Sequence, residues 1–512
     1  MKPQQPSSTH PTSTTPPAER LACRVRASLP ALGVIALAIA SSVVVTLGGC
    51  ANSAGIVGVA APIAPASVGL DAGGAAATAP AIATDWWQGF GDPALTGLVE
   101  RALADNPGPK VAQARLARAE AAVSGAQAAA GPQVNGSLDV TYQRFSETSI
   151  YPPPLGGSVR TLGAALVTGS WELDFFGRNH AAIEAAVGVQ RAAQAEAQGA
   201  RIVLASSVVK TYVQLGRLFE LRDVAAGALQ QREDTLSLIR QRVQAGLDTN
   251  VELREGEGAL PETRQQIEFF DEQIMLARHA LAALTAQPMN ALDGLEVKLR
   301  VVQATPLPVA IPADLLGRRA DITAARWRIE AAGSDVQNAK AQFYPNVNLV
   351  AFAGVASIGL NRLIQGGSQE VGIGPAIRLP IFDSGRLRAN LTGKTADLDA
   401  AIESYNGAVL DALRETADPI GSLRSIPRQQ AEQARAQAAA ESAFDLAMQR
   451  YKAGLGTYLT VLNAQTTVLN RRAQAVELKS RGLDAQVALI RALGGGYGAD
   501  AVAVTRMAHA GS

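Results

Sequence analysis

The chain has 512 residues, of which 47% are hydrophobic and 18% are charged, so it is neither disordered nor a polyelectrolyte. Its net charge of +1 excludes a broad basic surface for nucleic acid, and its 4% aromatic content favours closely packed helices over an aromatic-lined pocket. Both cysteines, Cys23 and Cys50, lie in the first fifty residues, and the four histidines are scattered. We therefore expect no disulfide framework, metal site or cofactor in the body of the chain.

Residues 1–49 have the pattern of a secretory signal, because a basic stretch precedes the uncharged apolar run 29–47. A membrane-spanning helix is the alternative, since nineteen apolar residues could just cross a bilayer. The sequence Leu47-Gly48-Gly49-Cys50 resembles the bacterial lipobox, which predicts cleavage before Cys50 and acylation of its thiol. Ala51 replaces the Asp that retains lipoproteins at the inner membrane of enteric bacteria, which favours the outer membrane.

The next segment, residues 50–84, is rich in Ala, Gly, Pro and Val and has no periodicity, which predicts a flexible tether behind the acylated cysteine. Trp86 and Trp87 follow, and we interpret them as packing residues that seat the entry segment. Asp92 before Pro93 has the pattern of a helix N-cap with proline at the first helical position.

Two pairs of segments alternate apolar and polar residues with the period of a β-strand, within 132–174 and within 345–383. The loop inside each pair is polar or rich in Gly and Pro, so each pair predicts a β-hairpin. A half-buried sheet on a soluble core is one interpretation. The other is a membrane sheet, which four strands cannot close into a barrel, because about eight is the minimum. The membrane interpretation therefore predicts a dimer or a trimer.

The stretches 180–284 and 387–493 are Ala-rich and helix-forming, and each contains a sustained seven-residue apolar repeat. Such a period predicts left-handed coiled-coil packing of long helices, for which a plain coiled-coil rod is the simplest alternative. The repeat positions are Ile239, Gly246, Leu253, Leu260, Ile267, Ile274 and Leu281 in the first stretch, and Met448, Leu455, Leu462, Leu469, Val476, Leu483 and Ile490 in the second.

The two halves of the chain are related by an internal repeat. The sequence QRVQAGLDT begins at Gln241, and QRYKAGLGT begins 208 residues later at Gln449. The same offset relates Gly177 to Gly385, each where a strand should turn into a helix and where glycine relieves unusual backbone angles. Pro380 lies near a strand end, where proline is tolerated. The chain is thus predicted to repeat the order helix, β-hairpin, long helix down, long helix up.

Beyond the tether, this duplication divides the chain into four parts. The first repeat comprises residues 85–284 and the second comprises residues 318–493. Between them lies a linker, residues 285–317, and a tail of residues 494–512 completes the chain.

Several motifs occur in the order typical of one family. They are the stretch DWWQGFGDP from Asp85, Asn106-Pro107, the stretch IPADLLGRRADI from Ile311, Phe343-Tyr344-Pro345, the stretch LPIFDSGR from Leu379, and Gly454 followed by the stretch YLTVLNAQ from Tyr458. With these motifs the chain resembles the TolC family of outer-membrane efflux channels, and in particular its lipoprotein branch, the NodT type.

The resemblance implies an α+β membrane protein with four β-strands and long α-helices per protomer. A homotrimer would form a 12-stranded β-barrel in the outer membrane of a Gram-negative bacterium and a 12-helix α-barrel in the periplasm. Residues 285–317 and 494–512 would contribute to an equatorial belt around the helices. The expected partners are outer-membrane lipid, a periplasmic adaptor and an inner-membrane pump, usually proton-driven, and the channel itself would be a passive exit for drugs or other small molecules.

The resemblance also implies a gate at the periplasmic aperture, where an acidic residue in a Glu-x-x-Asp pattern rings the closed opening at a helix turn. The matching residues here are Glu415 and Asp418, with Arg414 as a neighbour. Three like charges around an axis would repel one another and attract cations. Pro419 departs from the pattern, and a solvated charge at a helix end is the alternative interpretation of Asp418.

There are three alternatives to a small-molecule efflux channel. An enzyme is disfavoured, because the sequence has no metal-ligand spacing, nucleophile elbow or Walker loop. A periplasmic adaptor lipoprotein would carry one helical hairpin between small β-domains, whereas this chain repeats a β-hairpin and a helical hairpin. The exit channel of a type I protein secretion system would share the architecture, and only the lipoprotein-branch motifs favour small-molecule efflux over it.

Overall fold

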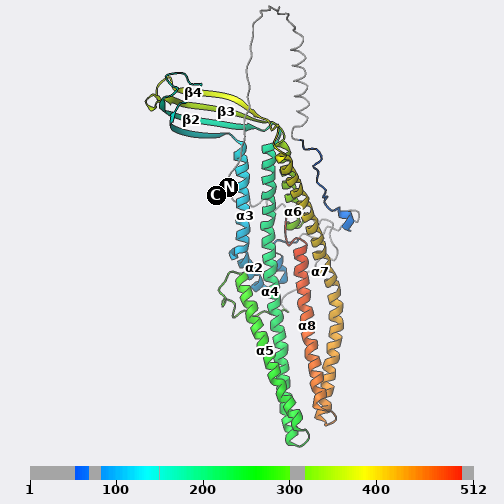
Figure 1. The fold of residues 1–512 in the computed structure, drawn as a ribbon. Coiled ribbons are helices and arrows are strands. Elements are labelled where there is room, and N and C mark those ends of the chain that lie inside the picture. Colours follow the sequence, from blue (N-terminus) through cyan, green and yellow to red (C-terminus); the bar gives the residue numbers. More distant parts are fainter. Residues whose placement is uncertain (1–51, 69–81, 149, 300–316, 499–512) are drawn as a thin grey trace, which may run out of the picture.

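The computed structural model describes residues 52–68, 82–148, 150–299 and 317–498, so the predicted signal segment, Cys50 and the end of the tail lie outside the described residues. The molecule is elongated, with a β-sheet at one end and long helices that run away from it to two hairpin turns at the other end (Figure 1). No helix among the described residues is long and apolar enough to cross a membrane.

The first repeat follows the predicted order. After η2 (Trp86–Phe90) come α2 (Pro93–Asp105) and α3 (Pro107–Ala130), which lead into the hairpin of β1 (Gln133–Arg144) and β2 (Val159–Leu173). The 67-residue helix α4 (Arg178–Gln244) then descends, and α5 (Asn250–Leu284) returns.

The second repeat has the same order. Helix α6 (Ala320–Ala341) precedes β3 (Asn346–Ile358) and β4 (Gln369–Arg378), with the short η4 (Leu360–Arg362) between the strands. Helix α7 (Arg386–Lys452) also has 67 residues, and α8 (Tyr458–Ala492) has 35, as α5 has. Both hairpins and both long helix pairs predicted from the sequence are therefore present.

The described strands form one antiparallel sheet in the order β1-β2-β3-β4, so the two predicted hairpins join through β2 and β3. Both ends of the sheet, β1 and β4, are edges without a further partner strand among the described residues. One face carries apolar side chains that are largely exposed, among them Leu138, Tyr142, Val371 and Ile373. The opposite face of β1 is polar, with Asn135, Ser137 and Asp139 among its residues.

Helix α4 is the central support of the molecule. It packs against α3 and α6 in the half near the sheet, and against α5 and α8 in the half near the turns (Figure 1). Helix α7 packs against α6 and then α8. A short helix of each repeat therefore lies above the returning helix of the same repeat, α3 above α5 and α6 above α8.

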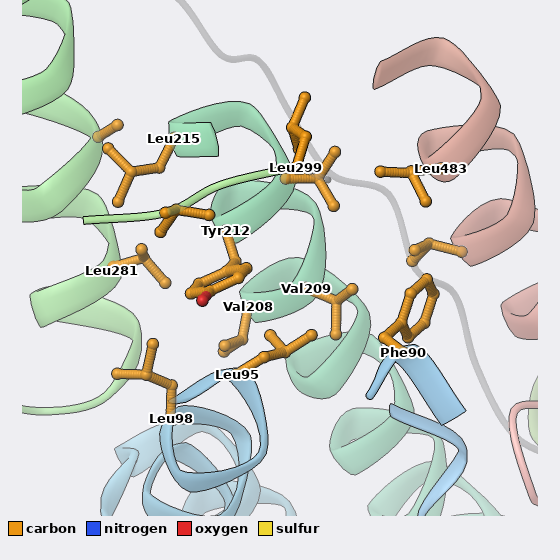
Figure 2. Packing of buried hydrophobic residues seen from close by; sticks show 14 of the residues in the cluster. Phe90, Leu95, Leu98, Val208, Val209, Tyr212, Leu215, Leu281, Leu299 and Leu483 are labelled. Atoms are coloured by element: carbon orange, nitrogen blue, oxygen red, sulfur yellow. The ribbon is translucent and has the colours of Figure 1, made fainter. Parts of the chain in front are cut away.

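The largest core surrounds the middle of α4, where Figure 2 shows Tyr212, Val208 and Val209 against Leu95, Leu281 and Leu299 from three other segments. Its members are nearly inaccessible to solvent. Asp92 links this core to its cap, because one carboxylate oxygen accepts from Ala94 N at 2.9 Å and the other accepts from the Tyr212 hydroxyl at 2.6 Å. The N-cap predicted before Pro93 is thus present, and Trp86 and Trp87 are buried packing residues as interpreted.

The segment predicted to be a flexible tether differs from expectation where it is described. Residues 52–63 lie along the upper part of α7 and make hydrogen bonds to its side chains. In the linker, residues 285–299 are described, and two of them, Val297 and Leu299, belong to the large core. Residues 300–316 and 499–512 lie outside the described residues.

Candidate functional site

The two turns at the far end from the sheet are built in the same way. Helices α4 and α7 are both capped by an Ala that precedes a glycine with positive φ, Gly246 at 71° and Gly454 at 75°. Leu247 N donates to Arg242 O and Leu455 N to Arg450 O, each at 2.8 Å, which closes a Schellman motif at both helix ends. The duplicated AGL sequence therefore encodes two equal, sharp turns at the tip.

One polar network joins the two turns. Arg242 of α4 makes a two-pronged ion pair with Asp248, with Nε 3.0 Å from Oδ2 and Nη2 3.3 Å from Oδ1. The hydroxyl of Tyr451, at the end of α7, donates to the same carboxylate. The Arg242 guanidinium lies 4.6 Å from the centre of the Tyr451 ring and also donates to Lys452 O. Asp248 thus holds the first helical hairpin to the second.

The ion pair is largely shielded from solvent, since only 11% of the Arg242 side chain and 9% of the Asp248 side chain are exposed. Burial raises the pKa of Asp248, but the hydrogen bonds from Arg242 and Tyr451 outweigh it and hold that pKa below its ordinary value of 3.8. Burial and the neighbouring carboxylate raise the pKa of the Tyr451 hydroxyl. At neutral pH the site is therefore an ionised Arg–Asp pair with a neutral tyrosine donor.

A small apolar core lies directly above the network and couples it to the helices. It contains Ile239, Tyr451, Tyr458 and Val461. A Cβ built on Gly256 of α5 would lie 3.0 Å from the Ile239 side chain, so glycine allows α5 to approach α4 closely there. Movement of Tyr451 would consequently disturb packing between both hairpins, not the hydrogen bond alone.

The network breaks the symmetry of the repeat. At the 208-residue offset, Asp248 corresponds to Gly456 and Tyr451 corresponds to Val243, so the second turn cannot build the same contacts. The shared motif is evident in the sequence, but Asp248 and Tyr451 were not predicted from it. The signal that could have found them is the departure from the repeat, at the two positions where one copy has a polar side chain and the other does not.

The residues predicted to ring the aperture lie elsewhere. Arg414, Glu415 and Asp418 are within the uninterrupted helix α7, far from the turn that follows Lys452, so their placement at a helix turn was wrong. Pro419 does not end the helix because it is buried and followed by Ile420, which packs against Leu489 and Leu493 of the neighbouring segment. Tertiary packing outweighs the backbone hydrogen bond that proline removes.

Glu415 has a structural partner set instead. Its carboxylate accepts from Arg319 at 2.8 Å and from Arg491 at 2.9 Å, which ties the start of α6 and the end of α8 to the middle of α7. Arg319 is buried and also pairs with Asp321. Asp418 remains an exposed residue of α7.

The predicted strand-to-helix residues lie at the other end of the molecule. Gly177 and Gly385 are the N-cap positions of α4 and α7, with φ of 73° and 87°. Pro380 lies two residues beyond the end of β4. Cys50, the predicted lipidation site, lies outside the described residues, among which no cluster of His, Cys, Asp and Glu is suited to a metal ion.

The protomer repeats a β-hairpin and a pair of long helices, with four strands in the described part of the chain. It has an exposed apolar sheet face at one end and a linked pair of helical turns at the other. This arrangement defines the class of channel-forming membrane proteins. The sequence matches the outer membrane efflux protein family over residues 98–287 and 311–495, which is more than half of the chain. The chain belongs to this family.

Relatives with assigned names match most of its length. The multidrug resistance outer membrane protein MdtQ of Escherichia coli O157:H7 is 33% identical over 422 residues, which cover 81% of this chain and 88% of MdtQ. The pyoverdine export outer membrane protein OpmQ of Pseudomonas aeruginosa is 32% identical over 428 residues, covering 82% of this chain and 89% of OpmQ.

Solved structures show the same fold. The outer membrane protein VceC of Vibrio cholerae matches with a TM-score of 0.77 and 36% identity, covering 81% of this chain and all of VceC. The outer-membrane channel OprN matches with a TM-score of 0.77 and 27% identity, covering 87% of this chain and 98% of OprN. The predicted TolC-like architecture is therefore confirmed.

Proposed function

We propose that this protein is the outer-membrane channel of a tripartite efflux system, a passive exit for small molecules that an inner-membrane transporter delivers through a periplasmic adaptor. The observation that carries the proposal is the sheet with two unpaired edges and an exposed apolar face, continuous with helices that end in linked turns. Family membership supports the same conclusion.

The unpaired edges require copies of the chain to complete the structure. An open strand edge exposes backbone donors and acceptors, and an apolar sheet face in lipid leaves them no other partner. Pairing of β4 in one copy with β1 in the next satisfies both edges and closes the sheet. We assign a homotrimer, in keeping with the predicted three-fold assembly, with α3 and α5 of one protomer beside α7 of the next.

The cargo class follows from the relatives' names. MdtQ is named for multidrug resistance, OpmQ for pyoverdine export, and the Burkholderia cepacia protein FusA, 36% identical over 321 residues, for fusaric acid resistance. All three names concern small molecules, which favours drug or metabolite efflux over type I protein secretion. Acylation of Cys50, which would anchor the chain in outer-membrane lipid, is part of the proposal and rests on the lipobox pattern.

Within this function the Arg242–Asp248–Tyr451 network keeps the aperture narrow at rest. It connects the turn of the first hairpin to the end of α7, so separation of the hairpins breaks a buried, charge-assisted contact. Opening requires that a partner offset this loss. The acidic gate predicted at Asp418 is not retained, because that residue lies remote from the turns.

Photo-crosslinking in intact cells tests the proposal. A photoreactive residue at Leu247 or Leu455, which are 65% and 70% exposed on the two turns, should capture a periplasmic adaptor of an efflux pump. The matched control is Ser425, a partly exposed residue near the middle of α7 and remote from the turns, which should capture much less. Capture of an adaptor from a secretion transporter would move the assignment to protein export. Capture of neither, together with unchanged drug sensitivity on deletion of the gene, would refute the channel function.

A further inference from the structure

Residues 52–63 are held on α7 by their backbone. The carboxylate of Asp399 accepts from Val59 N at 3.1 and 3.2 Å and from Ala60 N at 3.1 Å. Asn406 accepts from Ile63 N at 2.7 Å and donates to Ala61 O at 3.1 Å. These contacts join parts of the chain about 340 positions apart in the sequence, so they are not local capping interactions.

The start of the segment is fixed as well. Arg388, in the first turn of α7, donates to the carbonyl oxygens of Asn52 and Ala54. Ile56 packs against the buried cluster of Val336, Ala339 and Leu391 between α6 and α7. Figure 1 shows the segment in dark blue beside the upper part of α7.

The three polar contact residues form one stripe. Arg388, Asn406 and the intervening Asp399 are 11 and 7 residues apart, spacings of about three and two helical turns, so they lie on one side of α7 over roughly 27 Å. Gly58 fits the same stripe, because a Cβ there would lie 2.7 Å from Asp399 Oδ1.

The binding is directed at the backbone. The Val57 and Val59 side chains are 78% and 90% exposed, so burial of apolar side chains contributes only at the partly buried Ile56 and Ile63. An ionised carboxylate that accepts two adjacent amide N–H groups forms charge-assisted hydrogen bonds, which are stronger than neutral ones. Among the described residues Asp399 accepts hydrogen bonds from amides of residues 52–63 alone, whereas nearby Asp397 pairs with Lys394.

We propose that residues 52–63, here called the strap, are an in-chain ligand of the Arg388–Asp399–Asn406 stripe, and that their docking fixes where the N-terminal lipid anchor joins the molecule. A free tether of the length of residues 50–84 would let its end move by about 30 Å. A docked strap removes most of this freedom, because Arg388 holds Asn52 and Ala54 beside the junction of sheet and helices. The consequence for the anchor rests on the proposed acylation of Cys50.

Hydrogen exchange on the purified full chain tests docking without reference to transport. The amides of Val59, Ala60 and Ile63 should be protected, and Asp399→Ala should speed exchange at Val59 and Ala60 about tenfold or more. Asp399→Asn keeps the Oδ1 acceptor and should restore part of the protection. Asp411→Ala, which removes an exposed α7 carboxylate paired with Arg414, is the matched control and should change nothing in the strap.

A disulfide provides the complementary test. Gly58→Cys combined with Thr395→Cys leaves Asp399 in place and should oxidise readily, because a Cβ at residue 58 would lie 3.7 Å from Thr395 Cγ2. Gly58→Cys with Asp411→Cys should not. Unprotected strap amides in the wild-type protein, or equal disulfide formation in both pairs, would overturn docking. If the strap docks but Asp399→Ala leaves the membrane-anchored fraction of the protein unchanged, the role of docking in placing the anchor would be overturned. The effect of gene deletion on efflux is measured separately, and its result bears only on the proposed channel function.

Discussion

At the scale of single residues, Tyr451 is the donor that joins the two helical hairpins. Tyr451→Phe keeps the ring under Arg242 and removes only the hydroxyl that binds Asp248. A hydrogen bond to a charged group contributes about 1.5–3 kcal/mol, so amides of the turn 245–249 should exchange roughly tenfold to a hundredfold faster. Hydrogen exchange measures this. Tyr405→Phe, on the same helix but outside the network, should leave the turn unchanged, and an equal effect of both substitutions would contradict the assignment.

Acid should release the same network. The folded-state pKa of Asp248 lies below its ordinary value of 3.8, so its ionised form stabilises the tip fully above that value and the contribution is lost as pH falls through the lower, folded-state pKa. The protection of the turn amides, taken relative to intrinsic exchange at each pH, should therefore fall below about pH 4 in the wild type. Asp248→Asn should show fast exchange already at neutral pH and little further change on acidification. A variant that retained the acid dependence would assign it to another group.

At the scale of elements, each short upper helix is joined to the end of a lower one by its N-cap residue. The amide of Asn106, N-cap of α3, donates to Leu284 O at the end of α5 at 2.8 Å. In the second repeat Arg319, N-cap of α6, donates to Ala492 O at the end of α8 at 3.4 Å. Leu284 and Ala492 are related by the 208-residue offset, so the duplication preserved the junction while its chemistry changed from a neutral amide to a buried ion cluster.

Substitution of Asn106 separates the cap from the junction. Asn106→Ala loses the acceptor for Gly108 N and the donor to Leu284 O, which should cost about 2 kcal/mol in total. Asn106→Ser keeps a capping oxygen and loses only the donor, so about half of that cost is expected. The melting temperature of the purified protein should fall in the order wild type, Ser, Ala. Equal melting of the Ser variant and the wild type would show that the junction contributes nothing.

Elements were predictable from sequence because their signals are local or repeated. The alternation around Leu138 and the seven-residue spacing through Leu483 directly reflect the faces that strands and helices bury or expose. The placement of Asp418 could not be predicted in this way. Pro419 locally favours the end of a helix, and the packing of Ile420 overrides that preference. The contacts of Asp248 with Tyr451 and of the strap with Asp399 join residues hundreds of positions apart in the sequence. A local sequence pattern cannot indicate such long-range contacts.

At the scale of the whole molecule, the two faces of the sheet must meet different surroundings if copies close around a channel. Leu138 lies in the middle of β1 on the apolar face and is 72% exposed, whereas the neighbouring Ser137 points to the polar face. Arginine on a lipid-facing side at mid-membrane costs about 2–4 kcal/mol per chain, and a trimer incurs that cost three times.

Leu138→Arg should therefore sharply reduce the amount of protein recovered from the outer membrane as an oligomer, measured by fractionation and electrophoresis of unheated samples. Ser137→Arg adds the same charge one residue away, where water in the channel can solvate it, so assembly should persist while the ion selectivity of the reconstituted channel shifts toward anions. Equal loss of assembly in both variants would show that neither face is in contact with water. Because the substitutions share strand, charge and size, only the direction of the side chain can separate them, and that direction is what a closed assembly of this sheet determines.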